Sequence, residues 1–209
     1  MRGRTVKESQ PMNDCSDKKH ISKAEINELP MRQYDGPIHL CKTADEAEAA
    51  AKRLLGEELL GFDTETRPAF RKGESYDPSL IQLATQNEVY LFQIQLCGLT
   101  PSLLQVLASP RIIKAGVAID RDVSELQAMA SFRPDGFVEL ADIAKQARIK
   151  NLGLRGLTAI LFGFRISKRE QVSNWARHDL TESQQVYAAT DAWLGREIHL
   201  EFQRRRLIP

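Results

Sequence analysis

Apolar residues recur along most of this chain either at every second position or at spacings of three and four. The first pattern predicts strands and the second predicts helices. Alternating or short continuous apolar runs predict strands at residues 38–41, 59–66, 79–85, 89–94, 112–119 and 137–140. Spacings of three and four predict helices at residues 43–55, 100–108, 120–129, 143–147 and 154–161, and a last helix that begins at Thr181. Three successive strands followed by alternating helices and strands predict an α/β fold, a mixed sheet flanked by helices.

The first 35 residues are polar and carry only scattered apolar side chains. This composition predicts a flexible tail at residues 1–35, which leaves room for a short amphipathic turn at residues 21–29. Residues 36–209 are predicted to form one domain, because a chain of 209 residues with 42% hydrophobic content can bury one sizeable core.

Composition narrows the class of protein further. No apolar run approaches the roughly 20 residues that span a bilayer, and no secretory signal opens the chain, so no membrane partner is expected. The three cysteines are widely spaced, which is typical of reduced thiols and predicts a cytoplasmic location. The four histidines are scattered and do not indicate a zinc site. With a formal net charge of +1, any electropositive surface for nucleic acid must be local.

The last predicted helix carries a carboxylate on the face that should be buried. Tyr187 and Asp191 are four residues apart and share a helical stripe with Leu194, Ile198 and Phe202. An unpaired buried charge is costly, or it is neutralised by a proton. A positive group is therefore expected to lie beside Asp191.

Two further carboxylates lie on one face of the second predicted strand. Alternation places Leu60 and Phe62 on one side and Gly61, Asp63 and Glu65 on the other. Two acids this close repel each other unless a cation lies between them, and Gly61 leaves room for a group close to the backbone. The alternative is that both acids are solvated where the strand enters a loop, which is the more common case for an isolated pair.

A fourth carboxylate follows the strand predicted at residues 112–119. Asp120 occupies the position of a helix N-cap, which leaves Asp122 in the first turn of the helix. An acid there can simply complement the helix dipole, so Asp122 alone does not indicate a site.

Taken together, the four acids favour a metal centre over separate solvated charges. Hard divalent ions such as Mg²⁺ or Mn²⁺ prefer carboxylate oxygens, and two such ions can act on one phosphodiester bond. We therefore expect two divalent ions, with Asp63 bridging them and Glu65, Asp122 and Asp191 completing the site. Tyr187 would orient the attacking water, because a phenol with a pKa of about 10 is a poor base.

These residues, in this order, resemble the DEDD superfamily of 3′–5′ exonucleases, and more narrowly its DEDDy branch, which includes ribonuclease D and the exonuclease domain of the Werner syndrome helicase. The motifs that carry the resemblance are Phe62-Asp63-Thr64-Glu65, Lys114-Ala115-Gly116-Val117-Ala118-Ile119 with Asp122, and Tyr187-Ala188-Ala189-Thr190-Asp191-Ala192. The resemblance covers residues 38–202 and selects Asp122 rather than Asp120 as the ligand. Weaker matches, at residues 80–83, 137–142 and 173–175, are most similar to the Werner-type members.

The resemblance implies a ribonuclease H-like fold over residues 36–209 and an exonuclease that releases nucleoside 5′-monophosphates from a 3′ end. The implied partner is a single-stranded or 3′-ended nucleic acid, with DNA slightly favoured over RNA because of the Werner-type matches. The competing hypothesis is a catalytically silent nucleic-acid-binding module with the same fold, although all five catalytic positions are filled. Nothing in the sequence indicates an oligomeric state.

Two loops mix cations with an aromatic residue, a combination that suits phosphate attraction and base stacking. One loop follows the first acidic motif, and the other precedes the last helix. The residues that we expect to contact substrate are Phe70, Arg71, Lys72, Lys168, Arg169 and Trp175. The alternative is that the basic loops are merely solvated and that Trp175 anchors its loop to the core.

Overall fold

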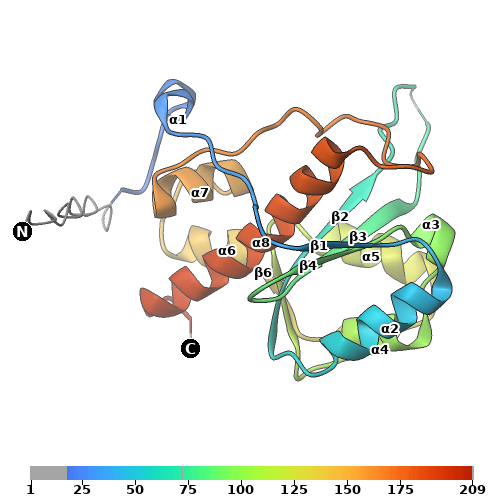
Figure 1. Ribbon diagram of the computed structural model, residues 1–209. Coiled ribbons are helices and arrows are strands. Elements are labelled where there is room, and N and C mark those ends of the chain that lie inside the picture. The colour runs from blue at the N-terminus through green and yellow to red at the C-terminus, as the bar shows by residue number, and fades with distance from the viewer. Residues whose placement is uncertain (1–17, 72, 209) are drawn as a thin grey trace, which may run out of the picture.

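The computed structural model describes residues 18–71 and 73–208, and its centre is a six-stranded mixed sheet (Figure 1). The strands are β1 (Ile38–Cys41), β2 (Leu59–Thr66), β3 (Pro78–Ala84), β4 (Val89–Phe92), β5 (Ile113–Gly116) and β6 (Phe137–Glu139). They lie side by side in the order β1-β4-β3-β2-β5-β6. The predicted mixed sheet is therefore confirmed.

Strand β2 lies inside the sheet and has a different partner on each side. It runs antiparallel to β3, with Asp63 opposite Gln82, and parallel to β5, with Gly61 opposite Ala115. The pairing with β5 ends at Gly61. The half of β2 that carries Asp63 and Glu65 therefore projects beyond β5.

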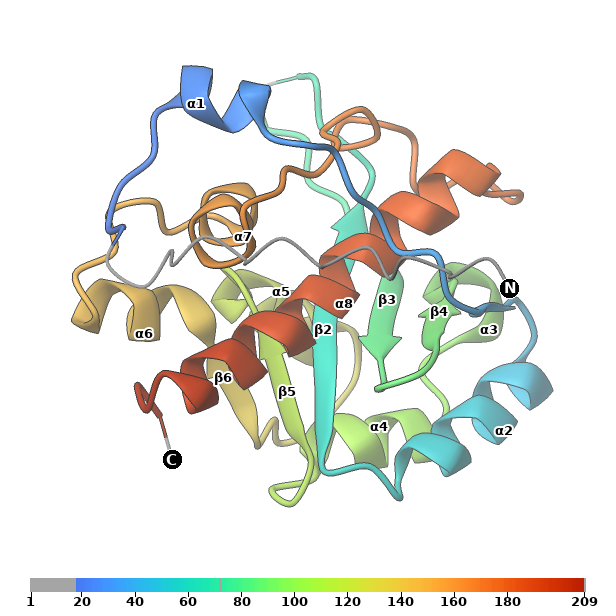
Figure 2. The same cartoon turned by 60° about the vertical axis from the view of Figure 1, so that its left-hand side comes forward.

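One face of the sheet packs against α2 (Ala44–Leu54), α3 (Ile94–Cys97), α4 (Pro101–Ala108) and α5 (Asp120–Met129) (Figure 2). Leu60 and Phe62 of β2 are buried in this core, as strand alternation predicts. The short helix α3 is not predicted by the sequence. The strand expected to reach residue 94 ends at Phe92, and Ile94 already belongs to α3.

The long helix α8 (Glu182–Arg204) crosses the opposite face, together with α6 (Leu140–Gln146) and α7 (Leu154–Phe162) (Figures 1 and 2). It begins where predicted, because Thr181 and Gln184 form the reciprocal hydrogen bonds of a capping box. Helix and sheet are in close contact: a Cβ on Gly61 would lie 1.8 Å from the carbonyl oxygen of Ala192. The space left by the missing side chain of Gly61 is thus occupied by the backbone of α8. This contact brings Asp191 close to β2.

Residues 18–35 pack on the domain, so the predicted flexible tail is wrong for this stretch. A capping box starts the short helix α1 (Lys23–Glu28), and Ile21, Ile26 and Tyr34 are buried. The short amphipathic turn that the sequence allows at residues 21–29 is present as α1, and the three apolar residues each contact other buried residues of the domain. The rest of the predicted tail lies outside the described residues.

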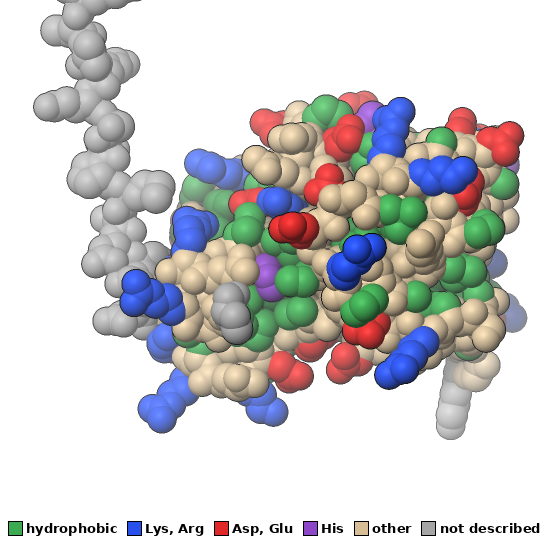
Figure 3. All heavy atoms as spheres, turned by 90° about the horizontal axis from the view of Figure 1, so that it is seen from below, with side chains coloured by type: hydrophobic (Ala, Val, Ile, Leu, Met, Phe, Trp, Pro, Cys, Tyr) green, Lys and Arg blue, Asp and Glu red, His purple; other side chains and the backbone are tan. Residues whose placement is uncertain are grey.

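The outer surface shows no broad separation of charge on the face in Figure 3, where basic and acidic side chains are interspersed. This agrees with the formal net charge of +1. Within the described residues, no helix combines the length and apolar character needed to cross a membrane. Recognition of a charged ligand is therefore expected in a local cavity rather than over a wide surface.

Candidate active site

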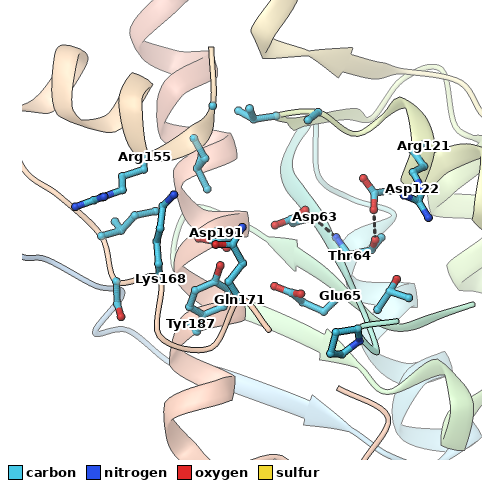
Figure 4. Close-up of a pocket in the computed structure, with 18 of the residues that line it drawn as sticks. Asp63, Thr64, Glu65, Arg121, Asp122, Arg155, Lys168, Gln171, Tyr187 and Asp191 are labelled. Carbon is cyan, nitrogen blue, oxygen red and sulfur yellow. Dashed lines mark hydrogen bonds between the residues drawn. The ribbon is translucent and has the colours of Figure 1, made fainter. Parts of the chain in front are cut away.

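Three carboxylates from two elements converge where β2 projects beyond β5 (Figure 4). Asp63 and Glu65 are on β2, Asp191 is on α8, and one oxygen of each lies within 4.8 Å of the others. Alternation along β2 turns Asp63 and Glu65 to the same side, and the close contact at Gly61 brings α8 to that side. The structure thus brings together three of the four predicted ligands.

Asp122, the fourth predicted ligand, lines the same cavity from α5 but is not part of this close group. The hydroxyl of Thr64 donates a hydrogen bond to the carboxylate of Asp122, and the backbone N–H of Thr64 donates to Asp63 at 2.9 Å. Thr64 therefore links β2 to the first turn of α5 and holds two acids of the site. Sequence patterns do not reveal this role, because the two partners of the hydroxyl bond are 58 residues apart.

The turn before α5 is fixed by Glu139 at the end of β6. Its carboxylate accepts hydrogen bonds from the N–H groups of Ala118 at 2.9 Å and Ile119 at 2.7 Å. Ala118 has a φ of 64°, a left-handed conformation that is unfavourable for residues with a side chain, and these bonds stabilise it. The predicted N-cap at Asp120 is wrong by one residue: the N-cap position is Ile119, and no side chain caps this helix.

Burial and mutual repulsion raise the pKa values of the acids. Removal from water raises the pKa of Glu65 to about 10, and the charge of Asp63 adds to the shift. The pKa of Asp63 is raised first by burial and then by the charges of Asp191 and Asp122. Burial raises the pKa of Asp191 to about 7, although the nearby phenol of Tyr187 opposes the shift. Among the described residues, no ion pair neutralises any of these acids.

This set of ligands fits a divalent cation. Closely placed carboxylate oxygens that are buried and lack a basic partner suit Mg²⁺ or Mn²⁺. Asp63, Glu65 and Asp191 could hold such an ion, and Asp122 borders the same cavity. A cation would offset the repulsion and allow the acids to ionise, so its binding is coupled to proton release.

Tyr187 lies one helical turn before Asp191, and its phenol lies close enough to influence the pKa of that carboxyl (Figure 4). Burial first, and then the charge of Asp191, raises the pKa of the phenol well above its usual range. The phenol therefore keeps its proton near neutral pH and can act as a hydrogen-bond donor but not as a base.

The acids line a cavity of about 780 Å³ whose other walls carry cations. Lys23 comes from α1, Arg155 from α7 and Lys168 from the loop before α8 (Figure 4 labels the last two). Arg67 lies over the ring of Tyr76, 4.7 Å from its centroid, and both residues line the cavity from the loop after β2. The cavity is acidic where a metal would bind and basic around it, which suits a phosphodiester.

Of the predicted substrate contacts, some line the cavity or the hollow beside it and others are exposed away from both. Lys168 lines the cavity, and Arg169 lines an adjoining hollow of about 400 Å³. Phe70 is 81% exposed, and Arg71 is exposed beside it at the far end of the first loop. Lys72 lies outside the described residues. The first loop lines the cavity with other residues than the predicted contacts: Arg67, Pro68, Ala69, Glu74, Ser75 and Tyr76.

Trp175 is 1% exposed and packs against Tyr187, with the two ring centroids 5.9 Å apart. Its ring presents no face to a base, so the predicted substrate contact is wrong and the alternative, an anchor for the loop, is correct. The anchor also supports the ring of Tyr187. A single tryptophan among polar residues does not distinguish the two roles in the sequence.

Comparison with known proteins settles which family shares this arrangement. Residues 38–206, which is more than half of the chain, match the family model described as 3′–5′ exonuclease. This chain belongs to the 3′–5′ exonuclease family. The predicted resemblance is confirmed, and the carboxylate cluster fits the divalent-metal dependence of these exonucleases.

Relatives of this exonuclease-family chain include the bifunctional 3′–5′ exonuclease/ATP-dependent helicase WRN of Mus musculus, at 32% identity, and the exonuclease mut-7 homolog of Homo sapiens, at 28%. The matches cover 80% and 85% of this chain but only 13% and 24% of those proteins.

Two solved structures confirm the predicted ribonuclease H-like fold. The Nibbler EXO domain of Aedes aegypti has a TM-score of 0.74 at 25% identity, and the match covers 83% of this chain and 90% of that domain. Ribonuclease D of Escherichia coli has a TM-score of 0.71 at 20% identity, and the match covers 82% of this chain and 47% of that enzyme.

Proposed function

We propose that this chain is a metal-dependent hydrolase that removes nucleotides one at a time from the 3′ end of a nucleic acid strand. The observation that carries the proposal is the convergence of Asp63, Glu65 and Asp191 beside the phenol of Tyr187. Membership in the 3′–5′ exonuclease family supports the same activity. Hydrolysis adds water across the bond between phosphorus and the 3′ oxygen, so the products are a nucleoside 5′-monophosphate and a strand with a new 3′ hydroxyl.

Two divalent ions, Mg²⁺ or Mn²⁺, are part of this proposal. Asp63, Glu65 and Asp191 would hold one ion, and Asp63 with Asp122 would hold the other. When bound, the ions polarise the phosphodiester and make the attacking water more acidic. Support for a second ion is that Asp122 lines the same cavity and that its charge affects the pKa of Asp63.

The residues around the acids would bind and orient the strand. Lys168 and Arg155 would neutralise phosphate charge from the cavity wall. The exposed ring of Phe70 would stack on a base, and Arg71 with Arg169 would attract the strand at the rim. Lys72 remains part of the proposal from the sequence alone. Tyr187 would hydrogen-bond the attacking water and so direct it at phosphorus.

Release of labelled mononucleotides tests the proposed function directly. Strands that carry a label on the 3′-terminal nucleotide would be incubated with the protein and Mg²⁺ or Mn²⁺, and the products separated by chromatography. We expect nucleoside 5′-monophosphates, and we expect EDTA to stop their release. A protein that binds the strand but releases no nucleotide with either metal would instead support the silent binding module.

The preference for DNA over RNA is a finer part of the proposal. It comes from the weaker Werner-type matches in the sequence, at residues 80–83, 137–142 and 173–175. Structural neighbours also include a Trypanosoma brucei ribonuclease D in complex with RNA U12 and a Brucella melitensis NrnC bound to pGG. Single-stranded DNA, recessed-end duplex DNA and RNA of matched sequence should therefore be compared by kcat/KM, and a higher value for RNA would overturn the preference.

Tyr187→Phe is expected to lower kcat by roughly a hundredfold, the usual effect of losing one well-placed hydrogen-bond donor. The substitution keeps the ring that packs on Trp175 but removes the hydroxyl. Metal affinity should change little, because the phenol is not a proposed ligand. Steady-state kinetics on the labelled strand and calorimetric titration with Mn²⁺ separate the two effects. An unchanged kcat would exclude Tyr187 from the mechanism.

A further inference from the structure

Residues 18–35, which we call the N-terminal strap, precede the region that matches the family model. In Figures 1 and 2 the strap runs from α1 past α7 and across α8 to β1. Its first part is held by the side chain of Asn151, which accepts a hydrogen bond from Ile21 N–H and donates one to Ile21 C=O, both at 2.9 Å. This pairing fixes the chain immediately before α1.

The second part of the strap is held beside α8 and the loop that precedes it. Backbone hydrogen bonds of 2.9 Å join Arg32 N–H to the carbonyl of Arg165, and Arg165 N–H to the carbonyl of Pro30. The N–H of Tyr34 donates at 3.0 Å to the hydroxyl of Thr190, the residue before Asp191. The strap is therefore a fixed part of the molecule next to the acids.

The strap contributes side chains to both hollows that open on the acids. Lys23 and Ile26 line the larger cavity together with Asp63, Glu65 and Asp191. Strap residues also line the adjoining hollow, which shares Tyr187 and Asp191 with the cavity; they are Met31, Arg32 and Gln33.

Lys23 is the strap residue best suited to bind an anion. It is exposed, and within the described residues it forms no ion pair, whereas the nearby Lys18 is bound to Glu25 at 3.0 Å. The strap also positions a second cation of the cavity, because Asn27 accepts a hydrogen bond of 2.7 Å from the guanidinium of Arg155. Both cations line the cavity that the carboxylates also line.

We propose that the N-terminal strap is a wall of the substrate site and that Lys23 binds a backbone phosphate upstream of the scissile bond. The proposal rests on the proposed exonuclease function. The cavity of about 780 Å³ lies toward the large end of the usual range for ligand sites, roughly 300–1,000 Å³, so it has room for more than the reacting phosphate. Because a dinucleotide has no phosphate upstream of the scissile bond, the strap would make the enzyme prefer longer strands over dinucleotides.

Lys23→Glu tests the proposal, with Lys19→Glu as the matched control. Lys19 is also an exposed strap residue, but it does not line either hollow. For a single-stranded oligonucleotide, we expect Lys23→Glu to raise KM roughly tenfold with little change in kcat, as loss of a phosphate contact does. The slope of log KM against log salt concentration should fall by about 0.7, the value for one phosphate of a single strand.

Substrate length separates a local contact from a general charge effect. A dinucleotide without a 5′ phosphate contains only the scissile phosphate, so the rise in KM caused by Lys23→Glu should be several times smaller for it. An equal rise for both substrates, or equal effects of Lys23→Glu and Lys19→Glu, would overturn the proposal. If the wild type releases no mononucleotide at all, the proposed exonuclease function itself is wrong. That outcome is distinct from an active wild type in which Lys23→Glu has no specific effect, which overturns only the role of Lys23.

Discussion

Asp191→Asn is expected to lower kcat for mononucleotide release by at least about a thousandfold. The amide has nearly the shape of the carboxylate, but it carries no charge and is a poorer ligand for a hard divalent ion. Asp191 is one of three close carboxylates, so its loss removes charge from the centre of the site. Single-turnover kinetics on a 3′-labelled strand at saturating Mg²⁺ measures the effect. Asp45→Asn, an exposed acid of α2, is the control and should keep the wild-type rate.

The same substitution should stabilise the metal-free protein above neutral pH. Burial raises the pKa of Asp191 to about 7 in the folded chain, from an ordinary value of 3.8. Because the folded pKa is the higher one, the folded state binds this proton more tightly. The resulting stability is complete below the ordinary pKa and is lost as the pH rises through the folded value. In EDTA at about pH 8 we expect Asp191→Asn to be more stable than the wild type by up to about 4 kcal/mol.

Thermal unfolding in EDTA at about pH 5 and about pH 8 distinguishes this effect from a general change in the fold. The wild type should lose more stability between the two pH values than Asp191→Asn does. Adding Mg²⁺ at the higher pH should stabilise the wild type more than the variant, because bound ligand favours the folded state. Equal pH dependence in both proteins would contradict a buried acid that lacks a basic partner, and wild-type kcat in the variant would contradict its role as a ligand.

Local periodicity predicts those parts of the site that depend on one element at a time. A period of two places Asp63 and Glu65 on one face of β2, and a spacing of four places Tyr187 with Asp191 on α8. Both arrangements are present in the structure. Asp122 is different, because its role could be selected only by resemblance to a family, and its carboxylate lies outside the close group.

The parts that sequence analysis misses depend on contacts between distant segments. The hydroxyl of Thr64 reaches Asp122, and Ile21 of the strap pairs with Asn151, 130 residues away. Neither contact leaves a periodic pattern in the chain. The burial of Trp175 is of the same kind, because it depends on the neighbouring helix α8 rather than on the polar residues that flank it. Periodicity therefore gives the elements and their faces, while tertiary hydrogen bonds decide how the elements are held together.

Gly61→Ala is expected to destabilise the fold by about 3 kcal/mol or more, at the upper end of what overpacking of a core usually costs. The new Cβ would lie 1.8 Å from the carbonyl oxygen of Ala192 and 2.8 Å from the N–H nitrogen of Arg196. Both are backbone atoms of α8, so no side-chain rotation can relieve the clash and the helix must move away from β2. Since Asp191 precedes Ala192 on that helix, the same movement separates it from Asp63.

The substitution should therefore lower stability and activity together, although Gly61 carries no functional group. For a chain of this size, 3 kcal/mol corresponds to a fall in Tm of roughly 6–12 °C, and a displacement of about 1 Å at the acids can reduce kcat about a hundredfold. Gly56→Ala is the matched control, because its Cβ would meet the carbonyl oxygen of Arg53 at 3.6 Å, an ordinary contact. If Gly61→Ala has wild-type Tm and kcat, α8 does not rest on β2 as described, and the meeting of Asp63 with Asp191 needs another explanation.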